Sequence, residues 1–85
     1  MSSISVAAFY RFAPIADPEG LRARLHAICR SFSVKGILLV AHEGINGTIA
    51  TQAERMADLL ETIREATGFH DLRPRLSQDE VMPFL

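Results

Sequence analysis

The spacing of the apolar residues alternates between the period of a strand and that of a helix, which limits the fold more than any single motif does. Two segments, residues 18–33 and 52–67, carry an apolar stripe at helical spacing. Shorter runs have β character instead, with β-branched and aromatic residues or a period of two. These runs are residues 4–12, 36–41, 48–51 and 72–77. The predicted element order is therefore β-α-β-β-α-β.

Two helical crossovers and one hairpin in this order are typical of the ferredoxin-like fold. We expect an α+β domain with a four-stranded antiparallel sheet in order 4-1-3-2 and both helices on one face. Pro74 supports that order, because a proline removes a ladder donor and is accepted only at an edge or strand end. We expect residues 1–85 to form a single domain, and the apolar residues 81–85 suggest that the polypeptide continues.

Local signals fix where the helices begin and end. Asp17 before Pro18 is a strong start for the first helix. Thr51 and Glu54 have the spacing of a capping box at the start of the second helix. Gly68 is placed to end that helix in a left-handed conformation.

The first strand separates its side chains into two sets, with Val6, Ala8, Tyr10 and Phe12 in one and Ala7, Phe9 and Arg11 in the other. We expect the open face of the sheet, the one away from the helices, to carry Phe9 and Arg11. Residues 37–41 are apolar without alternation, which predicts a strand covered on both sides, within this domain or by a neighbour.

Composition excludes several classes of protein. Hydrophobic residues are 48% and charged residues 22% of the chain, which is typical of a globular domain and argues against disorder. The net charge is −1, with no basic stripe of the kind that marks a self-sufficient nucleic-acid binder. The longest apolar run is far too short to span a bilayer, and the start lacks a secretory pattern, so we expect a cytoplasmic protein.

Neither a metal nor a cofactor is expected. Cys29 is the only cysteine and lies on the apolar stripe of the first helix, so we expect an inert core thiol. The three histidines, His26, His42 and His70, fall on different elements without ligand spacing.

The polar segment from His42 to Gly47 is the main candidate for function. Asn46-Gly47 between two β runs is a strong hairpin signal, so we expect this segment to be the loop. Gly44, Gly47 and Asn46 can direct backbone N–H groups at an anion, while His42 and Glu43 can serve as base or anchor. The alternative is a wide hairpin in which the glycines serve geometry only.

The residues bear on two further functions. The open face of such a sheet binds RNA in some domains, but the strand at residues 48–51 supplies no aromatic partner for base stacking. Packing against another domain is therefore favoured for that face. Arg11 and Asn46 are of the types that acylphosphatases use, yet residues 13–16 lack the glycine-rich loop of those enzymes.

Residues 34–50, with the core Glu-Gly-Ile-Asn-Gly-Thr, resemble the amino-terminal domain of the rhodanese-related tRNA uridine hydroxylases. Residues 8–12, Ser77 and residues 82–84 fit the same family. The resemblance implies oxygen-dependent formation of 5-hydroxyuridine at the wobble position of tRNA. It also implies that the essential cysteine belongs to a following rhodanese-like domain, which this chain does not include.

We therefore expect an accessory domain, inactive alone, that positions tRNA or the catalytic domain. The partners expected are tRNA and the intramolecular rhodanese-like domain, with no membrane. The candidate substrate-binding residues are His42, Glu43, Gly44, Asn46, Gly47 and Arg11. The alternatives are a non-catalytic interaction module and an acylphosphatase-like hydrolase.

Overall fold

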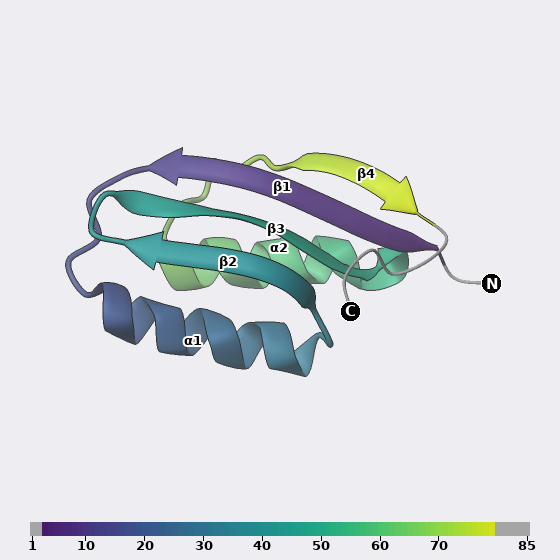
Figure 1. The fold of residues 1–85 in the computed structure, drawn as a ribbon, viewed down its shortest axis with the longest axis horizontal. Coiled ribbons are helices and arrows are strands. Elements are labelled where there is room, and N and C mark those ends of the chain that lie inside the picture. Colours follow the sequence, from purple (N-terminus) through teal and green to yellow (C-terminus); the bar gives the residue numbers. More distant parts are fainter. Residues whose placement is uncertain (1–2, 80–85) are drawn as a thin grey trace.

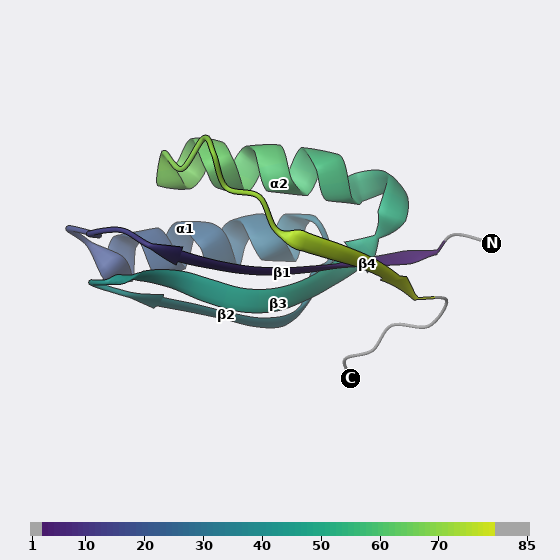
Figure 2. The same cartoon turned by 90° about the horizontal axis from the view of Figure 1, so that it is seen from above.

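The computed structural model describes residues 3–79, which form four strands and two helices (Figure 1). The elements are β1 (Ile4–Phe12), α1 (Pro18–Ser31), β2 (Lys35–Ala41), β3 (Gly44–Gln52), α2 (Ala53–Thr67) and β4 (Arg75–Asp79). All neighbouring strands are antiparallel and the sheet order is β2-β3-β1-β4. Figure 2 shows both helices on one side of the sheet. The predicted ferredoxin-like α+β fold is confirmed, strand order included.

β4 lies at the edge of the sheet, as Pro74 predicted. The strand begins at Arg75 rather than at Leu72. Leu72 instead belongs to the segment after α2, where its side chain is buried and its N–H donates to the carbonyl of Phe69 at 3.0 Å. Proline therefore stands just before the paired residues, where its missing N–H breaks no ladder bond.

Two of the three helix ends that were predicted from local signals are confirmed. The Asp17 carboxylate accepts a hydrogen bond from the Gly20 N–H at 3.1 Å, and Pro18 begins α1. Gly68 ends α2 with φ of 77°. The capping box is wrong, because the N-cap of α2 is Gln52 without a side-chain hydrogen bond. The hydroxyl of Thr51 instead donates to the carbonyl of Phe32 at 2.8 Å.

The core lies between the sheet and the two helices. It consists of buried apolar side chains from every layer: Ala7, Phe9, Ile15, Leu25, Ile45, Ile49, Met56, Leu59, Leu60, Ile63 and Leu72. Leu21, Ile28 and Phe32 of the predicted first stripe pack against it, partly buried. The stripe predicted for the second helix is confirmed as a core face.

The assignment of the two faces of β1 is wrong. Phe9 is only 7% exposed and belongs to the core, whereas Tyr10 and Phe12 are 63% and 69% exposed. Arg11 shares the helix-side face with Phe9, since its side chain pairs with Asp71 beyond α2. A period of two fixes which residues share a face, but it does not say which face the helices cover.

From Ile37 to Ala41, the side chains of β2 alternate between exposed and partly buried positions. Leu38 and Val40 pack against the core, while Ile37 and Leu39 are 63% and 58% exposed. Within residues 3–79, this edge strand is thus covered on one side only. Cover by a neighbour remains a prediction.

The hairpin between β2 and β3 is confirmed, but its turn is His42-Glu43 rather than Asn46-Gly47. Asn46 and Gly47 lie within β3, opposite Tyr10 and Phe9 of β1. Gly44 explains the early start of β3. Its φ is +148°, and a Cβ there would run into the Arg11 carbonyl oxygen and crowd the Phe12 Cα.

Gly44→Ala is expected to lower the free energy of unfolding by at least about 2 kcal/mol, because the new Cβ meets backbone atoms of β1 that cannot rotate away. Gly68→Ala is the matched control. Its φ of 77° is also left-handed, but nothing lies within 4 Å of the added carbon, so its cost should be about 1 kcal/mol. Urea denaturation measures both values. Equal losses would contradict the close approach of Gly44 to β1.

Candidate functional site

The turn at His42-Glu43 is bound to the segment that follows β1. The carbonyls of His42 and Glu43 accept hydrogen bonds from the N–H groups of Ile15 at 2.9 Å and Ala13 at 3.0 Å. The two loops therefore hold each other in place at one end of the sheet. Such cross-bonding gives the turn a defined conformation.

His42 has a structural contact in this arrangement. Its Nδ1 lies 3.2 Å from the carbonyl oxygen of Ile15. Because a carbonyl can only accept, the ring nitrogen carries the hydrogen and donates it. His42 and Ile15 are thus joined in both directions, and only Nε2 is left for other chemistry.

Gly47 serves close packing within the sheet. A Cβ at this position would run into the carbonyl oxygen of Ile37 and lie 2.9 Å from the Cα of Leu38. Gly47 and Gly44 therefore fit the alternative in which the glycines of residues 42–47 are needed for the path of the backbone.

Asn46 and Glu43 border the open face. The Asn46 side chain lies in register between Leu39 of β2 and Tyr10 of β1, on the side away from the helices. A shallow hollow near the turn is lined by residues of three strands and the turn, including Tyr10, Phe12, Leu39, Glu43 and Asn46. The structure thus brings Glu43 and Asn46 together with apolar side chains of that face.

A second hollow lies on the other side of Tyr10 and Asn46. Its lining includes Thr48 and the two arginines Arg73 and Arg75. Asn46 therefore stands between the hollow that Glu43 lines and one that carries the positive charge of Arg73 and Arg75.

Arg11 also borders the hollow near the turn, but its side chain makes its contacts on the helix side of the sheet. Its guanidinium forms a 2.8 Å ion pair with Asp71 and stands over the Phe69 ring, 5.2 Å from the centroid. The hydrogen bond from Arg11, with its positive charge, holds the pKa of Asp71 below its ordinary value. These contacts fasten the end of β1 to the segment that connects α2 with β4.

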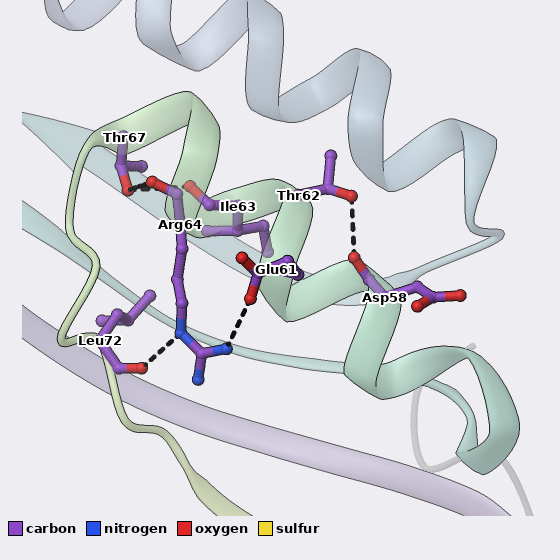
Figure 3. A network of polar contacts seen from close by, with 7 residues as sticks. All are labelled: Asp58, Glu61, Thr62, Ile63, Arg64, Thr67 and Leu72. Atoms are coloured by element: carbon purple, nitrogen blue, oxygen red, sulfur yellow. Dashed lines mark hydrogen bonds and ion pairs between the residues drawn. The ribbon is translucent and has the colours of Figure 1, made fainter.

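Arg64 of α2 fastens the same segment from the other side. Its Nε donates to the carbonyl of Leu72 at 2.9 Å, and its Nη1 lies 3.6 Å from the Oε2 of Glu61 (Figure 3). Leu72 directly follows Asp71, so the two arginines hold one short stretch of backbone between them.

Cys29 is half-buried rather than fully buried, in the hollow between α1 and β2. Burial raises the pKa of its thiol, so the reactive thiolate is scarce at neutral pH. Among residues 3–79, no three potential ligands from His, Cys, Asp and Glu gather into a metal-binding group. No helix in that range is both long and apolar enough to cross a bilayer.

Sequence reasoning missed the exposed apolar side chains of the open face. We call Tyr10, Phe12, Ile37 and Leu39 the open-face patch. One signal for it was present, namely the continuous apolar run of β2, which needs cover on two sides. The rings of Tyr10 and Phe12 meet edge to face, with centroids 5.0 Å apart.

Comparison with known proteins identifies the family. Residues 4–85 match the family described as the UPF0176 acylphosphatase-like domain. The chain belongs to that family. It is 46% identical over 84 residues to a tRNA uridine(34) hydroxylase of Caulobacter vibrioides, a match that covers 99% of this chain and 27% of the relative. An enzyme of the same name from Mesorhizobium japonicum is 46% identical over 81 residues, or 95% and 26% of the two chains.

The same-named enzyme of Gluconobacter oxydans is 43% identical over 81 residues, which is 95% of this chain and 26% of the relative. The chain therefore spans about a quarter of the length of the curated relatives that it matches. It corresponds to their amino-terminal part.

The acylphosphatase-like description fits the fold of this UPF0176 domain, but two of its residues argue against acylphosphatase chemistry. Arg11 pairs in register with Ile45, a core residue, whereas Asn46 pairs with Tyr10 on the open face. The two side chains lie on opposite faces of the sheet, and Arg11 is already paired with Asp71. They do not converge on one phosphate group.

The ion pair predicts a pH effect. In the native chain, NMR titration should give Asp71 a pKa below its ordinary value, and Arg11→Gln should raise the pKa of Asp71 toward that value. A depressed carboxyl pKa stabilises the fold at neutral pH, and this contribution is lost as the pH falls through the lowered pKa. The melting-temperature difference between the two proteins should thus shrink in acid, and it should be small because Asp71 is 67% exposed.

Arg73→Gln is the control for this titration. Arg73 acts on Asp71 only through its charge and contributes least to the shift. Its replacement should move the Asp71 titration less than Arg11→Gln does. An Asp71 titration that is the same in the native and Arg11→Gln proteins would refute the ion pair.

Proposed function

We propose that this chain is the amino-terminal accessory domain of an enzyme that hydroxylates uridine 34 of tRNA to 5-hydroxyuridine. The single observation that carries the proposal is the 46% identity over 84 residues to enzymes named for this reaction. The place of action is then the cytoplasm, where tRNA is modified and read.

Catalysis is assigned to the polypeptide outside this chain, in a following rhodanese-like domain. Two observations support that division. The chain corresponds to only 27% of the length of its Caulobacter relative. In addition, Cys29 is half-buried with a raised pKa, so it is poorly suited to be the essential cysteine.

Within the enzyme, the segment from His42 to Gly47 positions the tRNA substrate. His42 and the glycines hold the backbone, through the bond to Ile15 and the close approaches to neighbouring strands. Glu43 is left exposed at the tip, and Asn46 lies nearby along the same hollow. The carboxylate of Glu43 is able to accept hydrogen bonds from the N–H groups of unpaired bases. Arg11 takes part indirectly, by fixing the end of β1.

Glu43→Ala in the full-length enzyme should lower 5-hydroxyuridine in tRNA several-fold while changing the free energy of unfolding by less than about 0.5 kcal/mol, because the side chain is exposed. The measurement is the nucleoside content of tRNA from cells whose only copy of the enzyme carries the variant, with its abundance checked. Glu65→Ala removes an equally exposed carboxylate from α2 and should leave the modification unchanged.

If the Glu43→Ala enzyme is present at normal abundance and the 5-hydroxyuridine content of tRNA is unchanged, the turn has a structural role only. Unaltered 5-hydroxyuridine in cells that lack the whole protein would overturn the proposed function itself.

A further inference from the structure

The open-face patch is a feature of residues 3–79 that the proposed function leaves unused. Its four side chains are between 58% and 69% exposed. In register, Leu39, Asn46 and Tyr10 form one row across β2, β3 and β1, and Ile37, Thr48 and Ala8 form the next. The large side chains thus stand on the two flanking strands, with shorter ones on β3 between them. A group of large, exposed apolar side chains on one face of a sheet marks an interaction site.

We infer that the open-face patch is buried in the full-length enzyme against an apolar surface of the polypeptide outside this chain. The inference rests on the proposed function, which makes this chain one part of a longer enzyme. Nearly three quarters of the Caulobacter relative lies outside the matched region, enough to supply a partner domain. Because the two parts are linked, a modest contact area suffices to hold them together.

The charges around the patch fit a protein partner. None of its four residues is an Asp, Glu, Lys, Arg or His. The charged residues of the same face lie at its border, with Arg75 in register beyond Ala8, Lys35 beside Ala50 and Glu43 at the turn. Apolar side chains bordered by charged ones are usual in a protein–protein interface.

The aromatic geometry argues against RNA as the occupant. Base stacking needs ring faces that are free. Tyr10 and Phe12 instead contact each other edge to face, at an interplanar angle of 88°. The other strands of this face offer the aliphatic Ile37 and Leu39 and the small polar Asn46 and Thr48.

Asn46 gives the contact its specificity. Its amide lies in the middle of the patch, between Leu39 and Tyr10. A polar group that becomes buried is costly unless it is hydrogen-bonded, so the docked surface should present a partner for it. A generic apolar surface would not satisfy that requirement.

Hydrogen–deuterium exchange of the full-length enzyme, without tRNA, tests the inference. Leu39→Asp places a charge in the patch, yet the domain tolerates it because Leu39 is already 58% exposed here. We expect at least one peptide outside residues 1–85 to exchange ten-fold faster or more in this variant. Ala57→Asp adds the same charge on an exposed position of α2 and should change no peptide outside residues 1–85.

Ile37→Asp is the second variant and should release the same peptides. Exchange within β1 and β3 in each sample reports that the domain itself remains folded. Unchanged exchange outside residues 1–85 in a folded Leu39→Asp protein would overturn the inference. So would protection of residues 37–41 that appears only when tRNA is added, because the occupant would then be RNA. The exchange experiment needs no catalytic activity. Its outcome is therefore independent of whether the enzyme hydroxylates tRNA.

Discussion

The pairing of β1 with β3 is the interaction on which the rest of this domain depends. Nine residues of β1 pair in register with β3 at the centre of the sheet. That ladder sends Phe9 and Ile45 into the core and turns Tyr10 and Asn46 toward the open face. Gly44 allows the two strands to stay close where β3 begins. One backbone register therefore sets both the packing and the surface available for function.

Sequence alone predicted what local chemistry decides. Asp17, Gly68 and Pro74 act on their own or adjacent backbone groups, so their effects are readable without the fold. Two of the failures involve distant partners. The Thr51 hydroxyl donates to the carbonyl of Phe32 instead of capping α2. Phe9 was predicted on the wrong face because alternation does not say which face the helices cover.

The candidate site shows the same division. The segment His42–Gly47 was found from its residues, but the structure gives its members different positions. Glu43 is exposed at the turn and Asn46 lies on the open face, while Gly47 serves close packing within the sheet. Arg11 belongs to the helix side with Asp71. The different positions of these residues depend on the strand register and on which residues form the turn. Neither can be read from the motif itself. The open face then joins the two functional proposals, since Asn46 borders both the turn and the open-face patch.

The sidedness of β1 is the central claim, and paramagnetic relaxation in the 85-residue chain tests it most directly. A soluble, uncharged gadolinium chelate relaxes only protons that solvent reaches. The account predicts strong broadening of the ring resonances of Tyr10 and Phe12, which are 63% and 69% exposed, and almost none for Phe9, at 7%. Broadening of Phe9 with protection of Tyr10 and Phe12 would contradict it, and both the core and the open-face patch would have to be reassigned.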